Sequence, residues 1–235
     1  MKSITVTDNF KAYENSIYIY SSLGDVFLNT GSKVTEKIFG DRIHITVEAD
    51  ERYFKVVKAE IEDRIADIIT INYKSKYIKP QIRPIGLNEK ERELLLSAII
   101  SADLEDDKRY VLRKMDGMEN YTIDGIMHFR LKPLKEKWDE VVSYIPKGFK
   151  PTELKEFMTY LLNEKKESKA YITKQKVYDN KFKRLNRSIL LGEEDLKIVK
   201  EIILSCSTVI ELDGDIPKED EYYLKEYYGN RINFC

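Results

Sequence analysis

Cysteine, histidine and glycine-rich motifs are scarce in this sequence of 235 residues, and each scarcity excludes a class of site. Only two cysteines occur, Cys206 and Cys235, too few for a disulfide scaffold or a zinc site of paired cysteines. The two histidines, His44 and His128, form neither an HxH nor an HExxH spacing, so no metal site is predicted. Because the sequence holds neither a phosphate-binding glycine loop nor a GxSxG elbow, no cofactor and no catalytic residue is predicted.

Charge of one sign and long apolar runs are also lacking. The 40 basic and 41 acidic side chains leave a formal net charge of −1, so bulk electrostatics requires neither a nucleic acid nor an anionic membrane as partner. No apolar run approaches the roughly 20 residues that cross a bilayer, and the start lacks the pattern of a secretory signal. We therefore expect a cytoplasmic protein without a membrane span.

The first third, residues 1–84, predicts a small αβ unit that continues into a long helix. Alternating apolar residues predict three short strands: 3–7, 26–28 and 42–47. Apolar residues at spacings of three and four predict a helix between Phe10 and Leu23. A second stripe of helical period begins at Asp50, and the prolines at 80 and 84 mark its end.

The middle third, residues 85–168, is predicted to be helical. Asn88 and Glu91 have the spacing of a capping box ahead of the apolar run that begins at Leu94. Helical periodicity predicts two further helices, 122–145 and 152–166.

The last third, residues 169–235, predicts a β-hairpin followed by a βαβ-like closing unit. The hairpin is expected to pair 170–177 with 181–190 around the turn-prone dipeptide Asp179-Asn180. Alternating periods then predict helix 193–206, strand 209–212, helix 219–228 and strand 231–235. The predicted fold class is α+β, with a small N-terminal αβ unit, a helical middle and this C-terminal closure.

Three segments of the second half have a distinctive order of residues. They are Ile-Asp-Gly-Ile-Met-His-Phe-Arg-Leu-Lys at 123–132, Leu-Lys-Glu-Phe-Met-Thr-Tyr-Leu-Leu at 154–162 and Tyr-Gly-Asn-Arg-Ile-Asn-Phe-Cys at 228–235. In this order they resemble the YtxC family of sporulation proteins. The family pattern is matched at Asp124, Gly125, Phe129, Arg130, Gly229 and Arg231. A departure occurs at Ile126, where the family usually has Phe.

The resemblance implies a role in endospore formation in Gram-positive bacteria, and it carries no biochemical activity to this chain. Within the motif, helical spacing places Arg130 on the apolar face of Ile123 and Met127, so its guanidinium is expected to be partly buried. A buried guanidinium needs a partner, either a structural carboxylate of a neighbouring helix or an anion or protein. The further alternative is an alkyl stem that packs on the core while the charged head stays in water. Gly125 is expected to permit close helix packing rather than to cradle an anion.

The strongest local charge lies in residues 165–187, where nine basic residues outweigh two acidic ones. Aromatic residues interleave with the basic ones, a pattern of surfaces that stack bases and follow phosphates. The candidate nucleic-acid contacts are Lys174, Lys176, Lys181, Lys183 and Arg184. Strand alternation would put Lys181 and Lys183 on one face and Arg184 on the other. The alternatives are neutralisation by the acidic stretch 193–226 and protection of a sheet edge.

These observations favour a non-enzymatic cytosolic factor of endospore formation that acts through an unknown protein partner. The alternative is an RNA- or single-stranded-DNA-binding factor that uses the basic segment. An enzyme ranks third, because no set of nucleophile, base and oxyanion donors is evident in the sequence.

Overall fold

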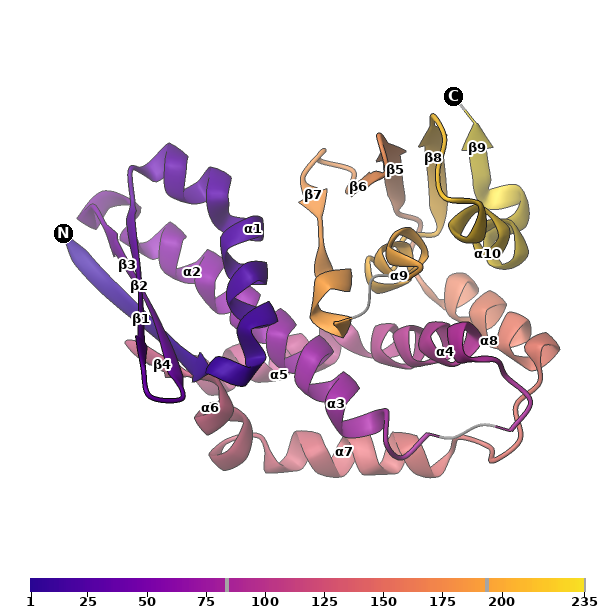
Figure 1. Cartoon of the computed structure of the whole chain (residues 1–235), viewed down its shortest axis with the longest axis horizontal. Helices are drawn as coiled ribbons and strands as arrows, with labels where there is room; N and C mark the ends of the chain where they lie inside the picture. Colours follow the sequence, from indigo (N-terminus) through magenta and orange to yellow (C-terminus); the bar gives the residue numbers. More distant parts are fainter. Residues whose placement is uncertain (83–84, 193–194, 235) are drawn as a thin grey trace. The chain divides into compact units, whose positions relative to one another are not determined.

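The computed structural model describes residues 1–82, 85–192 and 195–234. Three residues named in the sequence-based predictions, Pro84, Glu193 and Cys235, lie outside the described residues. The rest forms helices and two mixed β-sheets, which confirms the predicted α+β class (Figure 1). Among the described helices, none is both long and apolar enough to cross a membrane.

The chain divides into two compact units, each built from two separate stretches. The first unit comprises residues 1–73 and 105–140, and the second comprises residues 74–104 and 141–235. The three regions expected from the sequence follow changes of secondary structure along the chain, whereas these units follow proximity in space.

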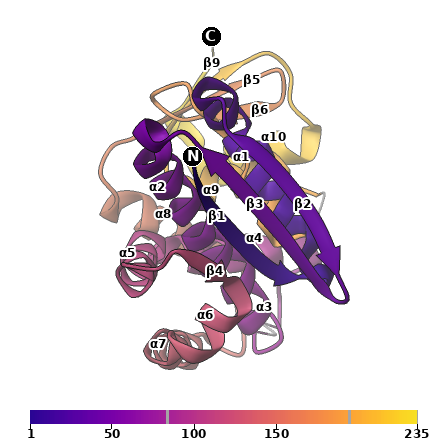
Figure 2. The same cartoon turned by 90° about the vertical axis from the view of Figure 1, so that its left-hand side faces the viewer.

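The first unit contains a four-stranded sheet in the order β2-β3-β1-β4, seen from its open side in Figure 2. Its strands are β1 (Lys2–Asn9), β2 (Lys33–Phe39), β3 (Arg42–Ala49) and β4 (Asn120–Thr122). β1 runs antiparallel to β3 and parallel to the short β4. Alternate side chains of β1 and β3 are buried, which agrees with the strands predicted at 3–7 and 42–47.

Two long helices cover the buried face of this sheet, α1 (Tyr13–Thr30) and α2 (Glu51–Asp67). Asp50 caps α2 with its side chain, which accepts a hydrogen bond from the Arg52 amide. The buried stripes of the two helices, with Leu23 and Ile61 among them, meet the apolar residues of the strands. α2 continues into a π-helical stretch, η2 (Ile68–Tyr73), and then into α3 (Lys74–Ile78).

Two elements of the first unit differ from the prediction. The prediction of a strand at 26–28 is wrong, because these residues belong to α1, where Phe27 extends the buried stripe of Leu23. α1 ends at Gly31, whose φ of 62° closes the helix with a left-handed cap. β2 was not predicted, because its side chains are mostly exposed and follow no apolar alternation.

The helix predicted at 122–145 is divided in two. β4 precedes α6 (Ile123–Phe129), and α7 (Lys132–Ser143) follows after two residues. Pro133 lies in the first turn of α7 and lacks a backbone N–H, so a continuous helix would lose a hydrogen bond there. α5 (Leu104–Met115) precedes this segment.

The second unit contains a five-stranded sheet in the order β7-β6-β5-β8-β9. Its strands are β5 (Lys169–Thr173), β6 (Lys176–Tyr178), β7 (Arg184–Leu185), β8 (Val209–Asp213) and β9 (Ile232–Phe234). β5, β8 and β9 are parallel, while β6 and β7 extend the sheet by antiparallel pairing. The helix α10 (Lys218–Tyr228) joins β8 to β9, so the predicted βαβ closure is present.

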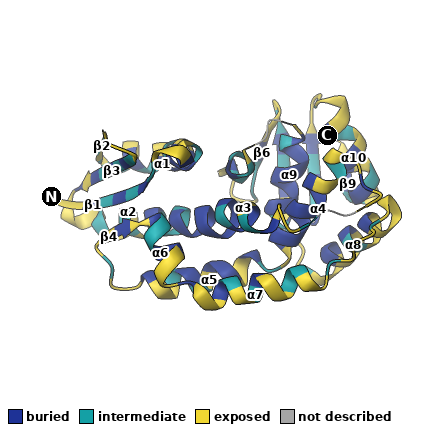
Figure 3. Ribbon diagram, turned by 60° about the horizontal axis from the view of Figure 1, so that its bottom comes forward, coloured by how far each residue is buried: buried dark blue, intermediate teal, exposed yellow. Residues whose placement is uncertain are grey.

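The core of the second unit surrounds α4 (Glu89–Ala102), in which every residue from 93 to 101 is buried (Figure 3). The capping box predicted from Asn88 and Glu91 is present at its start. α8 (Pro151–Glu164) and α9 (Lys197–Leu204) pack against α4.

The predicted hairpin is instead a three-stranded meander. Its first turn is Lys174-Gln175, where both residues have positive φ angles of 49° and 58°, the backbone of a tight two-residue hairpin turn. Asp179 and Asn180 belong to a second turn, between β6 and β7. The prediction failed because neither Lys nor Gln has the backbone preference of Asn or Gly for such a turn.

Candidate functional site

The first half of the motif segment is held inside the first unit. Both carboxylate oxygens of Asp124 lie 2.7 Å from Nη1 of Arg42, and Oδ1 also accepts a hydrogen bond from the Gly125 amide. The bond to Asp124 raises the pKa of Arg42. A Cβ added to Gly125 would lie 3.3 Å from Cγ2 of Thr122, so the missing side chain accommodates the turn before α6 rather than a neighbouring helix. These residues position the segment.

The second half of the motif segment faces solvent. The Phe129 side chain is 82% exposed at the end of α6, with the His128 ring edge-on at a centroid distance of 4.9 Å. Arg130 is exposed as well, so the expected burial of its guanidinium is wrong. The helix ends at this residue, and Nη1 donates a 3.2 Å hydrogen bond to the Lys114 carbonyl at the end of α5. Arg130 thus satisfies a free carbonyl of a helix C-terminus.

The C-terminal motif residues are structural in their contacts. Gly229 follows α10 with φ 51° and ψ −118°, a backbone conformation that only glycine adopts at low cost. Arg231 donates a 2.7 Å hydrogen bond from Nη2 to Oδ1 of Asn163 in α8. Both residues therefore position the end of the chain against its own unit.

A buried carboxyl group at the end of β1 was not among the predicted site residues. Asp8 is 3% exposed and accepts hydrogen bonds from Asn15, from the Tyr73 hydroxyl and from the Asn9 amide at 2.7–2.9 Å. Burial raises the pKa of Asp8 above its ordinary range. The signal was present in the sequence, because Asp8 continues the inward positions of Ile4 and Val6 along the strand.

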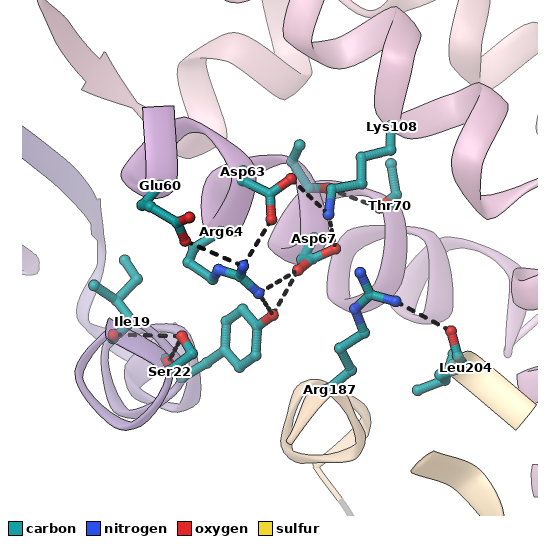
Figure 4. A network of polar contacts seen from close by, with 12 residues as sticks. Ile19, Ser22, Glu60, Asp63, Arg64, Asp67, Thr70, Lys108, Arg187 and Leu204 are labelled. Atoms are coloured by element: carbon teal, nitrogen blue, oxygen red, sulfur yellow. Dashed lines mark hydrogen bonds and ion pairs between the residues drawn. The ribbon is translucent and has the colours of Figure 1, made fainter. Parts of the chain in front are cut away.

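A second buried charge network joins α2 to α5 (Figure 4). Asp67 is fully buried, and its Oδ2 accepts hydrogen bonds from the Tyr18 hydroxyl at 2.6 Å and from Arg64 at 3.1 Å. The Lys108 ammonium lies 2.8 Å from Oδ1 of Asp67 and 2.8 Å from Oδ1 of Asp63. Arg64, which the sequence-based predictions did not single out, is thus a largely buried arginine paired with a carboxylate. Asp8 and the centre of this network at Asp67 and Lys108 are shielded from solvent, while Asp63 lies at its partly exposed edge. Their geometry is that of structural polar networks.

The basic segment of the second unit places all five candidate contacts in solvent: Lys174, Lys176, Lys181, Lys183 and Arg184. Four of these, all except Lys183, form no ion pair with a described residue. Lys181 and Lys183 lie in the turn between β6 and β7 and not on a strand, so the alternation expected for them does not apply.

The acidic stretch neutralises part of the basic segment. Glu211 pairs with Lys169, and Glu201 accepts the Arg187 amide and interacts electrostatically with that residue. Other acids of the stretch bind outside the basic segment: Glu219 pairs with Lys90 and Glu226 with Lys155. Lys174, Lys176, Lys181 and Arg184 therefore keep their charge with respect to the described residues.

Comparison of the chain with known protein families, with curated proteins and with solved structures finds no match. The candidate surfaces are therefore defined by their geometry alone. They are the exposed end of α6 in the first unit and, in the second, the strands β5, β6 and β7 with their two turns, called the basic meander below.

Proposed function

We propose that this protein is a non-enzymatic factor of endospore formation, and that it binds a protein partner with the exposed end of α6. The sequence resemblance to the YtxC family supports the process. The observation that supports binding is the exposure of Phe129, because this motif residue contributes little to the folded unit that carries it.

Burial of Phe129 by a partner would be energetically favourable. Removing a largely exposed phenyl ring from water stabilises a complex by about 1.5–3 kcal/mol, and aromatic residues beside arginine are enriched at the centres of protein interfaces. Arg130 supplies that arginine, with its guanidinium already oriented by the Lys114 carbonyl.

The charges beside Phe129 indicate an acidic partner. Arg130 and Lys132 follow Phe129 in sequence, and Lys114 lies in the last turn of the neighbouring α5. All three side chains are exposed. Lys132 lies 3.8 Å from Glu136, an exposed pair that leaves its ammonium accessible. An acidic segment carrying one or two apolar side chains would complement both the charge and the exposed ring.

Replacement of Phe129 by alanine in sporulating cells tests the proposal. Deletion of the gene is expected to lower spore yield while vegetative growth stays nearly normal, and Phe129→Ala is expected to reproduce much of that loss. The matched control is Phe39→Ala, which removes a phenyl ring that is 64% exposed on β2 of the same unit. Normal spore yield in Phe129→Ala at wild-type protein levels would contradict the proposed surface. An equal growth defect in non-sporulating culture would contradict the proposed process.

A further inference from the structure

The sheet of the second unit has one buried and one open face. On β5, Ala170 and Ile172 are buried, while Tyr171 and Thr173, which alternate with them, are only half-buried. The buried positions continue through Val177 of β6, toward the helical layer formed by α9 with α10 beside it (Figure 1). The opposite face therefore has its side chains directed away from these helices.

Strand register brings aromatic and basic side chains together on the open face. Tyr171 pairs with Tyr178 across β5 and β6, and Tyr178 pairs with Arg184 across β6 and β7. Because residues paired in register share a face, both tyrosines and Arg184 line the same surface. On the neighbouring β8, Glu211, which pairs with Lys169, and Asp213 also lie on this face. Lys176, two residues before Tyr178, also lies on this face.

The turn after β6 adds a third ring. Phe182 stacks on Tyr171 with a centroid distance of 4.8 Å and an interplanar angle of 26°, and its side chain is 68% exposed. Oδ1 of Asp179 accepts hydrogen bonds from the amides of Lys181 and Lys183 at 2.8 and 2.9 Å. The ring is thus held over the sheet by a defined turn, with basic residues on both sides of it.

We propose that this open face binds single-stranded nucleic acid. Phe182 and Tyr178 would stack unpaired bases, and five cations around them would contact the phosphates: Lys174, Lys176, Lys181, Lys183 and Arg184. Exposed aromatic rings on a sheet, with basic residues at its rim, are suited to unstacked bases and not to a closed duplex, whose bases are inaccessible to stacking.

Protection of a sheet edge explains fewer of these features. Edge protection requires charged side chains along the outermost strand, which accounts for Arg184 on β7 but not for Lys176 on the inner strand β6. It also gives no reason for Phe182 to hold a positive φ of 56° over Tyr171, because a bulky residue in that conformation is strained.

Fluorescence anisotropy of the full chain with labelled 12-nucleotide RNA, the matching DNA strand and the DNA duplex tests the proposal. We expect the duplex to bind more weakly than at least one single strand, and the two single-strand arms show whether the ligand is RNA, DNA or both. With three to five phosphates neutralised, the log–log slope of affinity against salt for a single strand is expected to be about −2 to −3.5.

Variants separate stacking from charge. Loss of one stacked base in Phe182→Ala is expected to weaken single-strand binding roughly 5- to 150-fold, while Phe182→Tyr retains binding. The double variant Lys181→Glu with Lys183→Glu is expected to abolish salt-sensitive binding. Its matched control is Lys37→Glu with Lys55→Glu, which changes the net charge equally at exposed lysines of the first unit. Thermal melting confirms that each variant is folded.

Four outcomes would overturn the proposal: no single-strand binding at low salt, duplex binding as tight as single-strand binding, unchanged affinity in folded Phe182→Ala, or equal loss in the two double variants. None of these measurements involves Phe129, so the result is independent of the proposed protein partner.

Discussion

Replacing Lys108 by methionine tests whether the buried charge network stabilises the first unit. The Lys108 side chain is 7% exposed and lies between two carboxylates, of which that of Asp67 is fully buried. Methionine keeps much of the aliphatic volume of lysine and removes the ammonium group. The change therefore isolates the charge more cleanly than alanine would.

The expected loss follows from what remains around Asp67. Oδ2 keeps the Tyr18 hydroxyl and Arg64, but Oδ1 loses the ammonium at 2.8 Å. Breaking a buried ion pair costs roughly 3–5 kcal/mol. Because Arg64 still compensates the charge, we expect about 3 kcal/mol of unfolding free energy to be lost. At about 2–4 °C per kcal/mol for a chain of this size, Tm should fall by roughly 6–12 °C.

Thermal melting followed by circular dichroism at neutral pH measures this change. Lys114→Met is the matched control, because Lys114 is an exposed lysine on the same helix, and its Tm is expected to stay within about 1–2 °C of wild type. In the background of Asp67→Asn, Lys108→Met should cost at least about 1 kcal/mol less than in wild type. Equal Tm values for Lys108→Met and Lys114→Met, or strictly additive losses, would refute the reasoning.

Three further changes are expected to have defined effects. Gly229→Ala should lower the free energy of unfolding by roughly 1–3 kcal/mol, because φ 51° and ψ −118° strain any side chain there. Gly24→Ala, in the middle of α1 with open space around it, should instead raise it by roughly 0.5–1 kcal/mol. A similar change in Tm for both variants would contradict this. Arg130→Ala should cost less than about 1 kcal/mol in the same melts, because its guanidinium is exposed; a loss of about 3 kcal/mol would restore the buried role expected from the sequence. Burial raises the pKa of Glu201, so its contribution to stability is present below the unfolded pKa and lost as pH rises through the folded pKa. The free energy of unfolding of Glu201→Gln should therefore rise relative to wild type as the pH increases above the unfolded pKa of glutamate, and a pH-independent difference in Tm would exclude the ionisation penalty.

The parts of the fold that sequence predicted correctly are those whose signals are local. The apolar alternation of β1 and β3, the helical stripe after Asp50 and the capping box at Asn88 all depend on residues a few positions apart. Where a local signal was absent or misleading, the prediction failed. β2 has mostly exposed side chains, and its place in the sheet is determined by pairing with β3.

For the candidate sites too, features with a local sequence signal were predicted and features that depend on distant contacts were not. Helical spacing placed Arg130 on a buried face only if the helix continued past it, and Pro133 prevents that. Asp67 was not identified, because its burial depends on a partner far away in the chain, Tyr18. The inward position of Asp8 follows from the alternation of β1, but its partner Tyr73 is equally distant in sequence. Sequence spacing identified a basic aromatic segment, but strand register was needed to bring its members onto one face.

The backbone of the basic meander bears on why these side chains are present at all. Lys174, Gln175 and Phe182 all have positive φ angles, which cost roughly 1–2 kcal/mol for residues other than glycine. Asparagine or glycine at the first two positions would make the same hairpin turn at lower cost, and glycine would fit the third. Folding stability alone thus favours none of the three. The proposed binding of a single strand would account for two of them, because Lys174 would supply a charge at the rim of the open face and Phe182 would supply its most exposed ring.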